Sequence, residues 1–332
     1  MNNEQIITKT ESNGFYILKA FAIIFAMSAH VVPYYLKTSS EVVRILTGIW
    51  QVLCRAGVPV FLIISAFFYK RDKKDTLKFW KKKFFSLILP WFIAGGLNTC
   101  YVYFGQNITE NFFVYALKFI FGYGSYFYFL TMLTFFFIVF KFIPKNLFVL
   151  LSLIVLTIVS LYLESIYKNP FTNLINNQYL NPFNWIGFFA LGILARKYRL
   201  DRKLIKHFWI IFIAIGLFAL GFYFFFKFEK STYFHLYALF YEIPAVVIFF
   251  YLSHLLGKCK AFIPLTFVGK WSFTMYMYHM MICQQICFKL PTYVTPYCPF
   301  IALGVMCLLI IVPYVICKKM RLNFYLYLFG LR

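Results

Sequence analysis

The sequence predicts an all-α integral membrane protein, a bundle of about ten transmembrane helices with both termini in the cytoplasm. Of its 332 residues, 62% are hydrophobic and only 13% are charged, whereas soluble domains carry about 25% charged residues. Long apolar runs recur along the chain, and a helix needs about 20 such residues to cross a bilayer. The 33 Lys and Arg residues gather mostly between these runs, as the positive-inside rule requires.

Ten apolar runs define the expected helices in chain order. They lie near residues 15–36, 46–69, 83–104, 125–143, 147–166, 182–196, 208–226, 233–253, 266–288 and 298–317. The sixth run is the shortest. Residues 111–121 are apolar but too few to span, so they suit the membrane interface, and a count of nine or eleven spans stays open. We expect one membrane domain over residues 1–332, with short cytoplasmic tails at 1–14 and 318–332, because no soluble segment is long enough for its own core.

The distribution of positive charge sets the expected orientation. With the N-terminus inside, most Lys and Arg residues fall on the cytoplasmic side, chiefly in clusters at 70–83, 196–206 and 318–332. Basic residues placed in this way argue against nucleic acid as a partner, despite a net charge of +23. The eight cysteines form no CxxC pair, so neither a metal site nor a disulfide framework is expected.

We single out five ionisable residues within the apolar runs, where a charged group is expensive and marks a functional site by default. They are Lys19 and His30 on the first run, Arg55 on the second, Glu242 on the eighth and His279 on the ninth. At about 1.5 Å per residue, His30 and Arg55 share the outer half of the membrane. His279 falls near its middle, and Lys19 lies near the cytoplasmic mouth.

His30 is the candidate catalytic residue, because a neutral imidazole accepts a hydroxyl proton at physiological pH. Arg55 stays charged and needs a carboxylate, phosphate or carbonyl partner. Glu242 is one candidate partner; alternatively it holds a proton, because burial disfavours its charged form. Three of these residues also have a purely structural interpretation. An intramembrane histidine such as His30 or His279 also bonds neighbouring helices, and Lys19 also suits snorkelling to the headgroups.

A basic run stands at the cytoplasmic start of the third expected helix, in LKFWKKKFFSLILPW. Lys78, Lys81, Lys82 and Lys83 suit the phosphates of a nucleotide-bearing donor such as coenzyme A. The positive-inside rule explains the same charges without any ligand. The two interpretations are compatible.

Several motifs follow one another along the chain. They are Lys19 and His30 separated by ten residues, RAGVPVFLIISAFFYKR from Arg55, YFYFLTML around Tyr128, FFALGILARKYR around Gly192, and GKWSFTMYMYH with Ser272, Tyr276 and His279. Over nearly its whole length the sequence resembles the membrane-bound acyltransferase family 3, which includes O-acetyltransferases of bacterial surface polysaccharides. Lys19 stands where the family has Arg, and Ala66 replaces the glycine that follows Ser65.

The resemblance implies transfer of an acyl group, usually acetyl, from cytoplasmic acyl-CoA to a hydroxyl of a surface polysaccharide or lipid-linked glycan, without a metal. The membrane is then a bacterial inner or plasma membrane. In this hypothesis His30 is the general base or a transient acyl acceptor, Arg55 polarises the carbonyl, and His279 and Glu242 tune the proton path. The expected donor-binding residues are Lys19, Ser65, Lys78, Lys81, Lys82 and Lys83.

Two other functions stay open. A transporter or flippase for the glycan also carries ionisable groups at mid-membrane, and a dependence on coenzyme A separates it from the enzyme. A non-catalytic partner of a polysaccharide synthase would leave surface acylation unchanged when His30 is replaced. The acceptor, the acyl group, and association with a second copy or with a polysaccharide-synthesis complex are not decided by the sequence.

Overall fold

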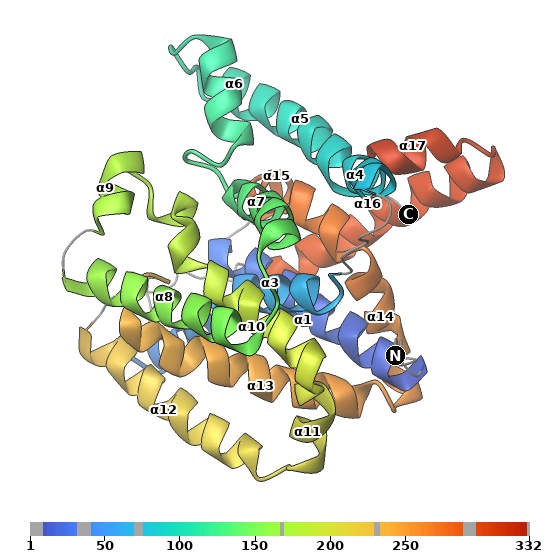
Figure 1. Cartoon of the computed structure of the whole chain (residues 1–332). Helices are drawn as coiled ribbons and strands as arrows, with labels where there is room; N and C mark the ends of the chain where they lie inside the picture. Colours follow the sequence, from blue (N-terminus) through green and yellow to red (C-terminus); the bar gives the residue numbers. More distant parts are fainter. Residues whose placement is uncertain are drawn as a thin grey trace.

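The computed structural model describes residues 9–31, 41–69, 76–166, 169–228, 233–287 and 297–330. Helices are the only regular secondary structure in these residues, so the predicted all-α class is confirmed (Figure 1). Within the same residues, seven helical segments are long and apolar enough to cross a membrane, and the helix Tyr128–Phe142 is a shorter apolar one. The count of about ten spans and the orientation stay predictions. Parts of the predicted elements, at 1–8, 32–36, 70–75, 288 and 331–332, lie outside the described residues.

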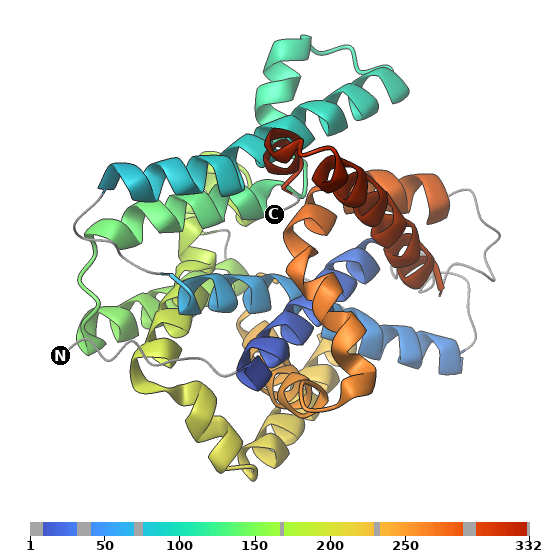
Figure 2. The ribbon, with the colours of Figure 1, turned by 90° about the vertical axis from the view of Figure 1, so that its right-hand side faces the viewer.

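The first helix, α1 (Lys9–Val31), is the central element of the bundle. It packs against α3 (Gly57–Phe67), α13 (Leu239–Leu256), α14 (Ile263–Lys270) and α15 (Ser272–Cys287). Its apolar side chains are accordingly buried, with Ile17, Ile23 and Met27 all 0% exposed. Figures 1 and 2 both show α1 in the interior of the molecule.

The other helices surround this centre. They are α2 (Glu41–Cys54), α4 (Thr76–Lys83), α5 (Leu89–Gly105), α6 (Phe112–Ile120), α7 (Tyr128–Phe142), α8 (Leu147–Ile166), α9 (Pro170–Ile175), α10 (Ile186–Tyr198), α11 (Leu200–Lys206), α12 (Ile210–Phe228), α16 (Cys298–Lys319) and α17 (Asn323–Leu328). Helices α8, α12 and α16 expose many large apolar side chains. Since lipid rather than water tolerates such a surface, the chain is a multi-pass membrane protein.

Two predicted spans are interrupted, and both breaks have a local cause. The run 46–69 forms α2 and α3 with a turn at Arg55 and Ala56, because Pro59 lacks the N–H that would bond to the Arg55 carbonyl in a continuous helix. The run 266–288 divides into α14 and α15, where the hydroxyl of Ser272 donates to the carbonyl oxygen of Gly269 at 2.9 Å. The first break places Arg55 at a helix junction inside the bundle.

Helix α10 approaches α3 closely through a pair of small residues. A Cβ atom on Gly192 would lie 2.3 Å from the carbonyl oxygen of Ile63 and 2.7 Å from the Cβ of Ala66. Gly192 therefore lets the two backbones meet, and the methyl group of Ala66 occupies the space that Gly192 leaves. This contact accommodates Ala66 where the family pattern has glycine.

Candidate active site

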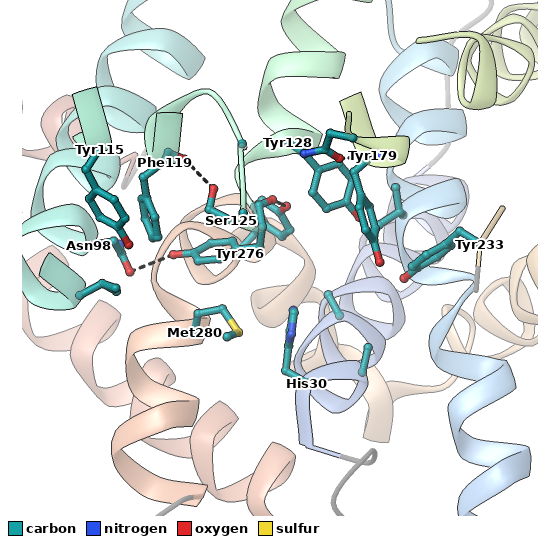
Figure 3. Close-up of a pocket in the computed structure, with 18 of the residues that line it drawn as sticks. His30, Asn98, Tyr115, Phe119, Ser125, Tyr128, Tyr179, Tyr233, Tyr276 and Met280 are labelled. Carbon is teal, nitrogen blue, oxygen red and sulfur yellow. Dashed lines mark hydrogen bonds between the residues drawn. The ribbon is translucent and has the colours of Figure 1, made fainter. Parts of the chain in front are cut away.

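A cavity of about 610 Å³ lies among α1, the α2–α3 junction, α5, α6, α15 and the connections at 122–128, 177–179 and 233. His30 and Arg55, chosen from the sequence as catalytic candidates, both line it. The side chain of His30 is exposed to this space. In Figure 3, Asn98, Tyr115 and Tyr276 lie on one side of the cavity, Tyr128, Tyr179 and Tyr233 on the other, and His30 below the space between them.

The structure brings His279 beside His30. The two ring centroids are 5.2 Å apart, at an interplanar angle of 43°, and His279 is 0% exposed. Nδ1 of His279 lies 2.6 Å from the carbonyl oxygen of Tyr276. A carbonyl oxygen only accepts hydrogen bonds, so Nδ1 carries the proton and Nε2 is the unprotonated nitrogen. Among the described residues Nε2 has no hydrogen-bond partner, so it can accept a proton.

Arg55 lies over the ring of Tyr233, with the guanidinium carbon 4.6 Å from the ring centroid. The arginine is also electrostatically coupled to Tyr179, Tyr241 and Glu242. Tyr233 lies in the α12–α13 connection, where burial raises the pKa of its hydroxyl while the charge of Arg55 opposes that shift. This phenol is therefore neutral and able to donate a hydrogen bond into the cavity.

Glu242, on the first turn of α13, is 1% exposed and does not line the cavity. Its Oε1 has no hydrogen-bond partner in the part of the chain that the structure describes. Arg55 is close enough to interact electrostatically with Glu242, but no ion pair between these two residues is found among the described residues. Whether Glu242 pairs with Arg55 stays a prediction.

The wall opposite Arg55 is held by hydrogen bonds between α5, the residues before α7, and α15. The hydroxyl of Tyr126 donates to Asn98 Oδ1 at 2.9 Å or to the carbonyl oxygen of Met277 at 2.8 Å. The amide of Asn98 donates to the same carbonyl at 3.3 Å, and the hydroxyl of Tyr276 donates to the carbonyl of Tyr126. These bonds fix α15, and with it His279, against the cavity.

Aromatic and amide side chains make up half of the residues that line the cavity. The aromatic residues are Tyr115, Phe119, Tyr126, Tyr128, Tyr179, Tyr233 and Tyr276, and the amides are Asn98, Gln106 and Asn177. Only Tyr128 and Tyr276 were singled out from the sequence, as family positions. Tyr126 belongs to the same motif as Tyr128 but was not selected. The remaining ones carry no charge and follow no motif, so the sequence gave no signal for them.

The expected donor-binding residues do not line this cavity. Lys78, Lys81 and Lys82 are exposed on α4, and Lys83 Nζ lies 3.6 Å from the ring centroid of Phe137. Ser65 is half-buried on α3.

Lys19, the remaining expected donor-binding residue, and two other lysines lie against aromatic rings. Lys19 Nζ is 5.6 Å from the ring centroids of both Tyr16 and Phe68, about 16 Å along α1 from His30. The structure adds two lysines that were not selected from the sequence. Lys141 lies 5.4 Å from the ring centroid of Trp80, and Lys145 lies 4.4 Å from that of Tyr69.

Residues 13–317 match the family model described as an acyltransferase domain, that of acyltransferase family 3. The chain belongs to acyltransferase family 3. The match covers every residue that lines the cavity and confirms the resemblance seen in the motifs. Comparison with curated proteins and with solved structures found no match. As a member of family 3, the protein is a membrane enzyme that transfers acyl groups.

Proposed function

We propose that this acyltransferase transfers an acetyl group from cytoplasmic acetyl-CoA to a hydroxyl group of a cell-surface polysaccharide or lipid-linked glycan. The observation that carries the proposal is the cavity itself. Its lining includes His30, whose ring lies beside that of His279, together with Arg55 and several tyrosines and amides. Such a surface suits a sugar, because aromatic faces pack against its C–H groups and amides bond its hydroxyls.

In the proposed reaction His30 accepts the proton of the glycan hydroxyl as its oxygen attacks the thioester carbonyl carbon. A carbon–oxygen bond forms, and Arg55 with the hydroxyl of Tyr233 stabilises the negative charge on the carbonyl oxygen. The carbon–sulfur bond then breaks, and the coenzyme A thiolate takes the proton from His30. The products are an O-acetyl ester and free coenzyme A. In the alternative order His30 first accepts the acetyl group and then passes it to the glycan.

The donor's phosphates bind on the proposed cytoplasmic side. Four ammonium groups, those of Lys78, Lys81, Lys82 and Lys83, project from one short helix, and Lys141 lies beside the same helix, near Trp80. This concentration of cations suits a polyphosphate group. Lys19 lies on α1 and Ser65 on α3. In the proposed complex both residues contact the part of the donor that extends from these lysines toward His30.

His279 holds its proton on Nδ1 and presents Nε2 to the site. In the proposed mechanism it shares the transferred proton with His30. Glu242 interacts electrostatically with Arg55, and in the proposed mechanism it helps to hold the guanidinium in place when no substrate is bound.

Mass spectrometry of surface glycans tests the function. Cells that produce the wild-type protein, His30→Ala or Arg55→Ala at matched membrane levels are compared with cells that lack it. His207→Ala is the matched control, because His207 is exposed at the end of α11. We expect an O-acetyl mass increment with the wild type and with the control, and none with the other two variants.

Other outcomes would reject the proposal. If the increment is absent while glycan export depends on the protein, the protein is a transporter. If the increment survives in His30→Ala, His30 is not the base.

A further inference from the structure

The segment between α8 and α10 forms part of the cavity wall. Asn177 and Tyr179 of this segment line the cavity. The ring centroid of Tyr179 lies 4.6 Å from that of Tyr128 and 4.8 Å from that of Phe234. The indole Nε1 of Trp185 donates to the carbonyl oxygen of Tyr179 at 3.0 Å. The segment therefore contributes two contact residues and is itself fixed by packing.

A single carboxylate lies behind this segment. Glu164, on the last turns of α8, is 7% exposed and is not among the residues that line the cavity. Its Oε1 accepts hydrogen bonds from the hydroxyl of Thr172 and from the amides of Asn181 at 3.4 Å and Asn184 at 3.3 Å. Its Oε2 accepts from the amide of Gln178 at 2.9 Å. All four donors belong to the segment.

The donors around Glu164 are buried as well. Thr172 is 3% exposed, Asn181 0% and Asn184 1%. No ion pair of Glu164 is found among the described residues, so neutral amides and a hydroxyl surround its charge. A buried carboxylate needs such bonds, and each of the four donors would lose an acceptor without it. The side chain thus joins four separate points of the segment to α8.

We propose that Glu164 is a positioning residue for the acceptor. By holding residues 169–184 in one conformation, it keeps Asn177 and Tyr179 at the cavity wall where the glycan binds. The inference rests on the proposed function, because it assigns the acceptor to this wall. In the proposed reaction the thioester carbonyl is handled by His30 and Arg55, which lie outside this segment, on α1 and at the α2–α3 junction. Loss of Glu164 therefore weakens acceptor binding much more than it changes donor binding or the chemical step.

Glu164→Gln is the sharpest substitution, because it keeps the size of the side chain but replaces one acceptor oxygen by a donor NH₂ group. That group faces donors that have lost their acceptor. Tyr179→Ala removes the contact residue directly. Glu11→Gln is the matched control, because Glu11 also accepts bonds from donors of a distant segment, including Arg202 Nε at 3.0 Å, but at the N-terminal end of α1.

The experiment uses full-length protein in vesicles, acetyl-CoA, and the unacylated glycan extracted from cells that lack the protein. Thiol release at saturating glycan gives the KM for acetyl-CoA and the kcat, and titration of the glycan gives the acceptor KM. For Glu164→Gln we expect the acceptor KM to rise at least tenfold, with the KM for acetyl-CoA and the kcat changed less than threefold. Glu11→Gln should leave both KM values unchanged.

A double variant tests whether Glu164 acts through Tyr179. If it does, Glu164→Gln adds less than a twofold change in the Tyr179→Ala background, because the contact is already lost. Two results would overturn this inference while leaving the proposed function intact. One is a double variant whose rise in acceptor KM equals the product of the two single effects, and the other is an active Glu164→Gln protein with an unchanged acceptor KM. A wild-type protein that acylates no glycan would instead overturn the proposed function, and with it the acceptor role of Glu164. If Glu164→Gln does not fold, Gln178→Ala is tested in its place. We then expect the acceptor KM to rise threefold or more, and an unchanged acceptor KM would refute the inference.

Discussion

Replacing Gly192 by alanine should destabilise the protein by about 3 kcal/mol, the upper part of the usual range for an overpacked contact. The new Cβ would lie 2.3 Å from the carbonyl oxygen of Ile63, whereas real Cβ atoms essentially never come closer than 3.0 Å to another heavy atom. Because the obstacle is backbone, no side chain can rotate away. Helix α10 must therefore move from α3 by at least about 0.7 Å, and the contacts along both helices weaken.

Thermal unfolding in detergent, followed by intrinsic fluorescence, measures this effect. A loss of about 3 kcal/mol lowers the melting temperature by roughly 4 °C in a chain of this size. Gly216→Ala on α12 is the matched control, because its Cβ would meet nothing within 4 Å in the described structure. Adding Ala66→Gly should recover only about 1 kcal/mol, since it relieves the 2.7 Å contact but not the backbone one. An unchanged melting temperature for Gly192→Ala would refute the close packing of α3 and α10.

Three further substitutions follow from the site. Arg55→Lys should lower kcat/KM about 100-fold, because an ammonium group cannot replace the planar fork of the guanidinium; a rate above half of wild type in the transfer assay would contradict this role. Tyr126→Phe should lower stability by about 1 kcal/mol in a thermal melt, since it removes the donor to Asn98 and Met277, and an unchanged melt would show those bonds to be unimportant. Lys81→Ala with Lys82→Ala should raise the KM for acetyl-CoA about fivefold, and the difference from wild type should shrink at high ionic strength; equal KM values would remove these lysines from the donor site.

The helical class was predictable from the sequence, and so was the selection of three ionisable residues that come together in the structure. Apolar runs indicate which segments lie in lipid, and basic connections indicate which segments lie in cytoplasmic water. His30 and Arg55, selected because charge is expensive in a membrane, line one cavity. His279, selected on the same ground, lies beside His30.

Other features depend on contacts between distant segments. The four donors to Glu164 lie eight to twenty residues away in the chain, and a lone glutamate near the end of an apolar run gives no sign of them. The turn at Arg55 needs knowledge of how α2 and α3 pack, because proline is also tolerated within kinked transmembrane helices. The tyrosines of the cavity cannot be told from lipid-facing tyrosines by periodicity alone.

The central claim is that His30 removes the acceptor proton in the cavity, and the most direct measurement is the transfer rate of radiolabelled acetyl groups from acetyl-CoA to unacylated glycan. The purified wild-type protein, His30→Ala and His207→Ala are compared in vesicles. The account predicts that His30→Ala loses roughly a thousandfold in rate, while His207→Ala retains the wild-type rate. A His30→Ala protein that folds and transfers acetyl groups within threefold of the wild-type rate would contradict it.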